Sequence, residues 1–319
     1  MADDDGRPFT RASDFPPEVL SLFDKYVHNI IDRRTFLDSA ARFAVGSVTA
    51  ATLLEALSPR FAEAQQVPKT DPRIKAEYVE LPSPQGYGTA RGYLVRPAPG
   101  GGGAGGGGKG PAKTDKKRPA ILIVHENRGL NPHIEDVARR MALENFIAFA
   151  PDALFPLGGY PGDEDKGREL FTKLDQAKTR EDFVAAAGFA RSRPDCNGKL
   201  GAVGFCYGGG IVNFLATRLP DLGAAVPFYG MAPATDKVAA IKAPLLIHFA
   251  GNDDRINASW PAYEAALKAA HVKYEAFTYA GTQHGFHNDT TPRYDPAAAK
   301  LAWQRTIAFF GHTLRATGK

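Results

Sequence analysis

The sequence predicts an α/β protein with a mostly parallel central sheet and helices on both faces. From residue 71 onward, short β-rich runs alternate with longer stretches of helical pattern, and this alternation is typical of parallel strands connected by helices. Several of the runs are apolar without interruption, as expected for strands buried on both faces. The chain has 319 residues, 44% of them hydrophobic, which suffices for one large core and a small additional unit.

The expected elements begin with two strands that form a leading antiparallel pair. Further strands then alternate with helices up to the carboxyl terminus. The expected strands are 76–81, 90–95, 119–124, 146–150, 199–205, 224–228, 244–249 and 273–279. The expected helices are 134–144, 166–191, 209–218, 258–270 and 297–314.

Charge and cysteine content exclude several classes of protein. The formal net charge is only +4, so no nucleic-acid partner is expected. Cys196 and Cys206 are separated by a segment that reads mostly as one strand, which would place them roughly 20 Å or more apart. A disulfide requires Cα atoms within about 7 Å, so both thiols should be free. No H-E-x-x-H spacing occurs, and we expect neither a metal nor a cofactor.

Residues 1–66 are expected to be an N-terminal extension, and residues 67–319 the main domain. Residues 33–34 are an arginine pair before a weakly apolar run, and Ala62-Glu63-Ala64 matches an A-x-A cleavage site. The pattern resembles a twin-arginine leader, so we expect contact with the export machinery and a periplasmic location. Asp38 and Arg42 make the run too polar for a stable membrane span. The alternative is a helical arm retained on a cytoplasmic protein.

A glycine-rich segment at 97–118 separates two of the expected strands. It contains a Gly-Lys pair, but Gly110 stands where a phosphate-binding loop needs Ser or Thr. We predict a flexible surface insertion.

The stretch Gly-Phe-Cys-Tyr-Gly at 204–208 joins an expected strand to an expected helix. This is the G-x-nucleophile-x-G elbow with Cys206 in the place of serine. Glycines flank the nucleophile because side chains there would collide across the tight turn. The positive end of the following helix favours a thiolate, and the amide of Tyr207 can donate to an oxyanion. The alternative is a small buried cysteine in a packed turn.

An acid and a histidine follow in the chain order of a nucleophile–acid–base triad. Asp253 and His284 each come just after an expected strand, so both belong to the edge of the sheet where the elbow lies. Histidine would act as the base and the carboxylate would orient it. Asp254 and His287 remain competitors. His125 and His248 lie within expected strands and are expected to be buried packing residues.

The combined motifs resemble the dienelactone hydrolase family, the cysteine branch of the α/β-hydrolases. The resemblance runs from about residue 76 to the carboxyl terminus and rests on Gly-Phe-Cys-Tyr-Gly-Gly, Gly-Asn-Asp-Asp-Arg-Ile, His-Gly-Phe and Val-His-Glu-Asn-Arg-Gly-Leu-Asn. It implies an α/β-hydrolase fold and a triad of Cys206, Asp253 and His284. It also implies that Glu126 contacts the resting thiol and that the amide of Asn127 is the second oxyanion donor. A structural ion pair of Glu126, for example with Arg128, is the alternative.

The resemblance implies hydrolysis of a small-molecule lactone or activated ester through a thioester. Family members that open dienelactones bind the substrate carboxylate with two arginines, but this chain has Pro156 and Asn288 at those places. Replacement charges would come from Arg128, Arg255 or Arg293. The rival hypothesis is a non-catalytic scaffold that binds a ligand or partner, with Cys206 a redox-sensitive thiol.

Overall fold

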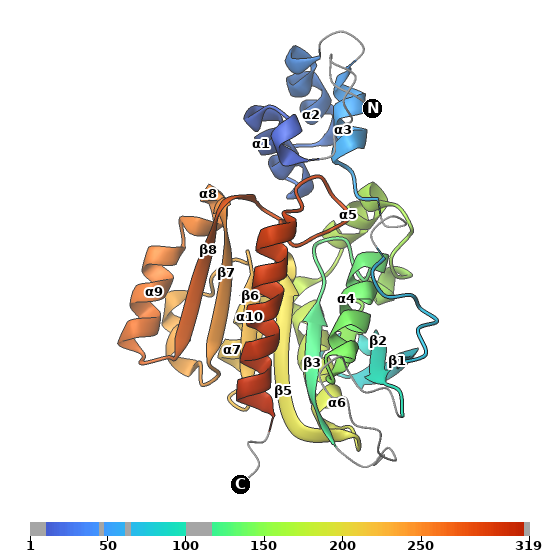
Figure 1. Ribbon diagram of the computed structural model, residues 1–319, viewed down its shortest axis with the longest axis vertical. Coiled ribbons are helices and arrows are strands. Elements are labelled where there is room, and N and C mark those ends of the chain that lie inside the picture. The colour runs from blue at the N-terminus through green and yellow to red at the C-terminus, as the bar shows by residue number, and fades with distance from the viewer. Residues whose placement is uncertain (1–10, 45–47, 61–64, 100–116, 316–319) are drawn as a thin grey trace.

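A single sheet organises the main domain of the computed structural model, which describes residues 11–44, 48–60, 65–99 and 117–315. The strand order is β1-β2-β4-β3-β5-β6-β7-β8. The strands β3 to β8 run parallel, whereas β2 pairs antiparallel with both β1 and β4 (Figure 1). The bounds are β1 Ile74–Ser83, β2 Gly88–Pro97, β3 Arg118–Val124, β4 Ile147–Pro151, β5 Cys196–Phe205, β6 Ala224–Phe228, β7 Leu245–Asn252 and β8 Tyr274–Gln283.

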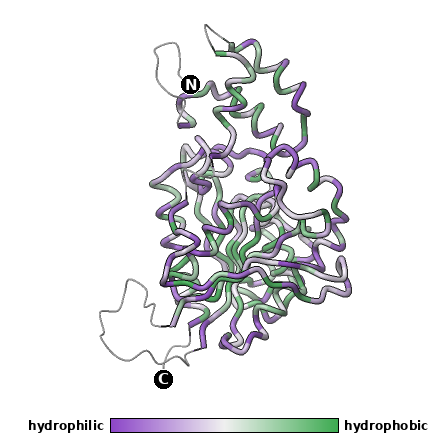
Figure 2. Tube along the Cα trace, turned by 90° about the vertical axis from the view of Figure 1, so that its right-hand side faces the viewer, coloured by the Kyte–Doolittle hydropathy of each residue, from purple (hydrophilic) through white to green (hydrophobic). Residues whose placement is uncertain are grey.

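Helices cover both faces of this sheet. Side chains alternate along each strand, so in β3 Leu122 packs in one core cluster with α6, α7 and α9, whereas Ile121 packs in the other with α4 and α10. Figure 2 shows the hydrophobic trace concentrated in the strands between the helical layers. The helices are α4 Pro132–Leu143, α5 Glu164–Thr172, α6 Gln176–Ser192, α7 Tyr207–Arg218, α8 Asp254–Asn257, α9 Trp260–Ala269 and α10 Pro296–Leu314, with 3-10 helices at η3 Phe155–Leu157 and η4 Thr235–Ala240.

The structure confirms the predicted fold class and most of the predicted elements. The leading strands pair antiparallel, with Ala76 opposite Val95 and Leu81 opposite Ala90. The single helix expected over 166–191 is wrong, because the chain breaks into α5 and α6. The carboxylate of Asp175 accepts the amides of Ala177 and Lys178, and this N-cap starts a new helix.

Three short helices form a separate unit at the N-terminal end of the described chain. We call residues 11–60, apart from 45–47, the N-terminal cap. It contains α1 Pro17–Val27, α2 Arg33–Ala40 and α3 Ala50–Leu57, with 3-10 turns at η1 Ala12–Asp14 and η2 Ala41–Phe43. Asp32 and Thr49 cap α2 and α3 with their side chains. The helices share an apolar core that includes Phe23, Phe36 and Leu53.

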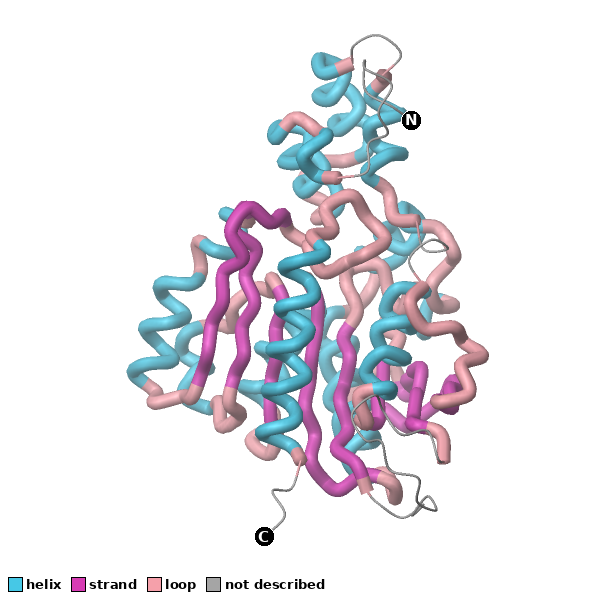
Figure 3. The backbone as a smooth tube through the Cα atoms, viewed as in Figure 1, coloured by secondary structure: helices cyan, strands magenta, loops and turns pink. Residues whose placement is uncertain are grey.

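The N-terminal cap stands at one end of the sheet, beside the loops that follow β7 and β8 (Figures 1 and 3). The arginine pair of the predicted leader begins α2 at Arg33. Most of the predicted glycine-rich insertion, residues 100–116, lies outside the described residues. Within the described ranges, no helix is long and apolar enough to cross a membrane.

Candidate active site

The nucleophile elbow is present between β5 and α7. Cys206 has φ +55° and ψ −114°, a conformation that residues other than glycine rarely adopt. A Cβ atom at Gly204 would collide with the carbonyl of Gly208, and one at Gly208 with the carbonyl of Val124. Glycine is therefore needed on both sides for steric reasons. Both cysteines are free, as predicted.

An imidazole and a carboxylate meet beside the elbow. The Nδ1–H of His284, directly after β8, donates to Oδ2 of Asp253 at 2.5 Å. The sulfur of Cys206 and a ring nitrogen of His284 lie within 4.8 Å of each other. The other imidazole nitrogen, Nε2, is buried and has no hydrogen-bond partner in the described part of the chain. It is therefore free to exchange a proton with the sulfur or with a water.

The competing residues occupy other places. Asp254 is the first residue of α8 and exposed, whereas Asp253 is buried. The ring of His287 stacks on Phe205 with centroids 5.0 Å apart, and burial lowers its pKa to about 3. His125 and His248 are fully buried, as predicted.

The charges around the sulfur favour an ion pair. Burial opposes ionisation of the Cys206 thiol, but the neighbouring imidazoles of His284 and His28 outweigh it and lower its pKa to about 6. Burial likewise opposes the His284 imidazolium, but the Cys206 thiolate and the Asp253 carboxylate raise its pKa to about 10. One proton is therefore shared between the sulfur and the imidazoles beside it.

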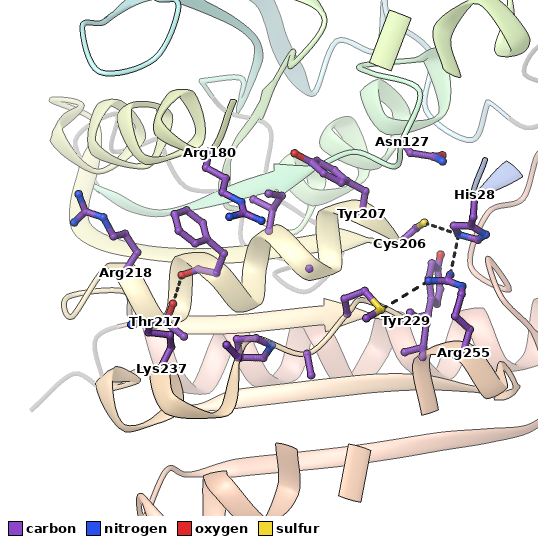
Figure 4. A pocket seen from close by; sticks show the side chains of 18 of the residues that line it. His28, Asn127, Arg180, Cys206, Tyr207, Thr217, Arg218, Tyr229, Lys237 and Arg255 are labelled. Carbon is purple, nitrogen blue, oxygen red and sulfur yellow. Dashed lines mark hydrogen bonds between the residues drawn. The ribbon is translucent and has the colours of Figure 1, made fainter. Parts of the chain in front are cut away.

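A second imidazole, from the N-terminal cap, touches the sulfur. His28 follows directly after α1, and its Nε2 lies 3.3 Å from Sγ of Cys206 (Figure 4). Its Nδ1 lies 2.7 Å from the carbonyl oxygen of Asp24 and 3.2 Å from Oδ1 of the same residue. The guanidinium of Arg255 lies 2.9 Å from Nε2. The ring of His28 packs edge-on against that of His284, with centroids 4.7 Å apart.

Glu126 and Asn127 have partners of two different kinds. Glu126 is buried, and Oε2 accepts the side-chain amide of Asn288 at 3.0 Å. Asn288 stands where dienelactone-opening relatives were expected to have an arginine, so here an amide contacts this carboxylate. The side-chain amide of Asn127 donates to the carbonyl of Val27 in the N-terminal cap at 2.6 Å. Tyr207 is the first residue of α7, and an amide there has no acceptor within the helix.

The three candidate arginines differ in availability. Arg128 is buried against Glu164, with Nε 2.6 Å from Oε2, which replaces the ion pair with Glu126 that sequence reasoning had left open. Arg293 is buried and lies over the ring of Phe23, 5.0 Å from its centroid. Arg255 lines the cavity beside the sulfur. Among the three, only Arg255 is placed to meet a substrate without first leaving a buried position.

A cavity of about 840 Å³ opens beside Cys206. Ile211, Phe214 and Met231 give it an apolar wall, and four cationic side chains line it, namely Arg180, Arg218, Lys237 and Arg255. No Asp or Glu is among the described residues that line it. Such a cavity suits an anionic molecule with an apolar body.

The spacing of His28, Cys206 and His284 would also suit a metal ion. The Arg255 guanidinium at His28 Nε2 opposes a second positive charge at that point, because like charges repel at short range. The arrangement is better suited to proton transfer than to holding a metal.

Sequence reasoning missed His28, Asp24 and Tyr229. Tyr229 has φ +36°, and its buried hydroxyl has no hydrogen-bond partner in the described ranges; its ring lies 4.9 Å from that of His284. No motif marks these residues. His28 and Asp24 were overlooked because their segment was interpreted as part of a leader, although Pro17 and the N-cap residue Asp32 indicate helices there.

The fold and site define the chain as an α/β-hydrolase. The model of the Dienelactone hydrolase family matches residues 109–314, and the chain belongs to that family. Family membership makes it a carboxylic ester hydrolase. A second family model, YqhI-like, matches residues 8–44, which include α1 and α2 of the N-terminal cap but not α3.

Known relatives agree with this assignment. The chain is 52% identical over 128 residues to the "Putative hydrolase fragment YghX" of Escherichia coli (strain K12), covering 40% of this chain and 97% of the relative. It is 31% identical over 215 residues to a "Putative carboxymethylenebutenolidase" of the same organism, covering 63% and 79%. The crystal structure titled "Putative Dienelactone Hydrolase" from Klebsiella pneumoniae superposes with a TM-score of 0.62 at 28% identity, covering 74% of this chain and 99% of that one.

Proposed function

We propose that this protein hydrolyses a lactone or activated ester with Cys206 as nucleophile, His284 as base and Asp253 as the residue that orients the base. The observation that carries the proposal is the 2.5 Å contact between His284 and Asp253, at an imidazole within 4.8 Å of a sulfur on a strained elbow. These are the three roles that a nucleophilic triad requires.

In the proposed reaction the thiolate attacks the carbonyl carbon, and the electron pair of the carbonyl moves to oxygen. The amides of Tyr207 and Asn127 would stabilise this oxyanion. The intermediate collapses to a thioester as the bond between carbon and the leaving oxygen breaks, and that oxygen takes the electron pair and a proton from an imidazolium beside the sulfur. His284 then takes a proton from water as that water attacks the thioester, and the carboxylic acid and the thiolate are released.

The lining of the cavity supports an anionic substrate. Of its four cationic side chains, Arg255 contacts His28, which in turn contacts the sulfur of Cys206. We expect an ester that carries a carboxylate to have a lower KM than the matching amide-substituted ester, and added salt should reduce the difference because it screens the charges. Arg255→Gln should raise KM for the anionic ester selectively. Equal KM values for the two esters would contradict an anionic substrate.

The decisive experiment is a panel of activated esters, enol lactones and simple lactones, assayed with wild type, Cys206→Ala, His284→Ala and Asp253→Asn. Loss of the sulfur or of the His284 imidazole should lower kcat by about 100-fold or more. Cys196→Ala is the matched control, because that thiol lies at the opposite end of β5. Unchanged turnover in Cys206→Ala would exclude the mechanism. An inert wild type would favour the alternative, a binding scaffold with a redox-sensitive thiol.

The twin-arginine leader and periplasmic location remain proposals. The arginine pair and the Ala62-Glu63-Ala64 site support export. The contacts of the N-terminal cap with Cys206 and Asn127 support the alternative, an arm that is retained. Mass spectrometry of the protein from its native host distinguishes them: a chain that starts at Gln65 would favour export with cleavage, and a chain that retains His28 would favour the attached arm.

A further inference from the structure

The N-terminal cap surrounds the nucleophile with a second set of acid–base groups. His28 approaches the sulfur through Nε2 at 3.3 Å, and Asp24 holds the opposite ring nitrogen. On another side of the sulfur, His284 is held in the same way by Asp253. Each imidazole thus has a carboxylate-bearing residue at Nδ1, which leaves Nε2 as the nitrogen that can exchange a proton.

The partners of His28 define its tautomer. Both groups near Nδ1 are acceptors, namely the carbonyl and the carboxylate of Asp24, so Nδ1 carries a proton. Arg255 offers only donors, so its 2.9 Å contact requires a lone pair on Nε2. Sγ of Cys206 lies 3.3 Å from the same nitrogen, which becomes available to the thiol proton when Arg255 moves away. A neutral imidazole in this position can accept the proton of the thiol.

We propose that His28 is a catalytic residue, which takes the proton of the Cys206 thiol and delivers it to the oxygen of the leaving group. This inference rests on the proposed ester hydrolysis and adds a role to it. His284 keeps the second half-reaction, the activation of water. The N-terminal cap is then part of the active site, and the reaction divides between two imidazoles.

The proton and electron changes balance in this scheme. The S–H bond breaks and its proton moves to Nε2 of His28. Sulfur attacks the carbonyl carbon; when the tetrahedral intermediate collapses, the bond between carbon and the leaving oxygen breaks, and that oxygen takes both the electron pair and the His28 proton. His284 takes a proton from the attacking water, the carbon–sulfur bond breaks, and this proton returns to sulfur. The sum is ester plus water giving acid plus alcohol.

Charged groups around His28 make the transfer feasible. Asp24 faces the forming imidazolium, whereas Arg255 and His284 oppose it. Burial also opposes protonation of His28, but the Cys206 thiolate and Asp24 raise its pKa above the ordinary value. Arg255 must lose its contact with Nε2 when His28 becomes protonated, and it is then available to a substrate anion in the cavity.

The test is His28→Gln, which keeps an acceptor near Arg255 but cannot carry the proton. Esters of one acid with phenol and alkyl alcohol leaving groups are compared. A poorly basic phenolate needs little proton donation, whereas an alkoxide needs much. We expect kcat/KM to fall about 100-fold for the alkyl ester and less than about 10-fold for the aryl ester, within the range of general acid catalysis. His312→Gln, an exposed histidine near the end of α10, is the control and should change neither.

A second measurement needs no substrate. The rate of alkylation of Cys206 is followed against pH in a Cys196→Ser background, with limited proteolysis to verify that the N-terminal cap is docked. His28→Gln should raise the midpoint by about 1 pH unit, the effect of losing a neighbouring charge. If the midpoint and the leaving-group dependence both stay as in wild type while the cap is docked, the inference is wrong. If wild type hydrolyses no ester, the proposed function fails separately, and the alkylation midpoint alone decides whether His28 shares the proton.

Discussion

The N-terminal cap and the hydrolase domain are held together by different kinds of contact. The hydrolase domain has two apolar clusters, one on each face of its sheet, and the buried apolar cluster of the cap contains only cap residues. Contacts between the two units are largely polar: Asn127 binds the carbonyl of Val27, Arg168 lies 3.8 Å from the ring centroid of Tyr26, and Tyr26 donates to Asp165. The comparison indicates two units with separate cores, joined at the active site by directional bonds.

The largest expected effect is on the core of the cap. Phe36 is fully buried there, and Phe36→Ala should cost about 3–5 kcal/mol. The cap, with its small core, is expected to unfold while the hydrolase domain keeps its transition, because their buried clusters are separate. Calorimetry measures the unfolding transitions of the two units, and limited proteolysis shows which unit is unfolded.

The matched change in the hydrolase domain is Phe228→Ala, also fully buried. It should lower the free energy of unfolding of the hydrolase domain by a similar amount. If Phe36→Ala instead lowers a single transition of the whole chain, the two units unfold together and the comparison is wrong.

A smaller effect is expected from the elbow. Gly204→Ala places a methyl group against the carbonyl of Gly208, and overpacking of this kind costs about 1–3 kcal/mol. The cap should keep its stability, whereas the rate of alkylation of Cys206 should change because the sulfur shifts. Gly188→Ala is the control, since a Cβ atom at that helical glycine would meet no neighbour within 4 Å.

One contact between the two units, that of Arg168 with Tyr26, can be removed without changing the core of either unit. Arg168→Ala removes a guanidinium that lies over Tyr26 and donates to its carbonyl oxygen. The free energy that holds the cap on the hydrolase domain should weaken by about 1 kcal/mol, the scale of one such contact. Limited proteolysis between the two units would detect this change. Lys173→Ala, close to Arg168 in the chain, removes an ammonium that pairs with exposed Glu169 and should have no such effect. Equal protease sensitivity in the two variants would contradict the proposed role of Arg168.

The smallest expected effect is on pH dependence. Burial opposes ionisation of Asp24, but the hydrogen bond to His28 and the charges of His284, His28 and Arg293 hold its pKa well below the usual range. A carboxyl group with a depressed pKa stabilises the folded form above its unfolded pKa, about 4, and this contribution is lost as pH falls further. Docking of the cap should therefore weaken below about pH 4, and Asp24→Asn should reduce this dependence. Protease sensitivity measured against pH tests it.

Sequence reasoning reached most of the hydrolase domain because its strands are continuous apolar runs and its turns contain glycine. The break between α5 and α6 was missed because apolar positions continue through Leu174 and only Asp175 marks a new start. Cys206, Asp253 and His284 follow a known chain order. His28 could not be found in this way, because its contact with Cys206 depends on the docking of a distant segment and on no local motif.

The position of Val27 and His28 over the elbow has a practical consequence for anyone who prepares this protein. Trimming the first 64 residues as a presumed leader would remove the imidazole that contacts Cys206 and uncover one side of the sulfur. Because an accessible thiolate is readily oxidised to sulfenic and then sulfinic acid, such a shortened preparation should lose titratable thiol on storage in air faster than the intact chain. Expression of both lengths under a reducing agent would keep that chemical damage from being mistaken for a lack of activity.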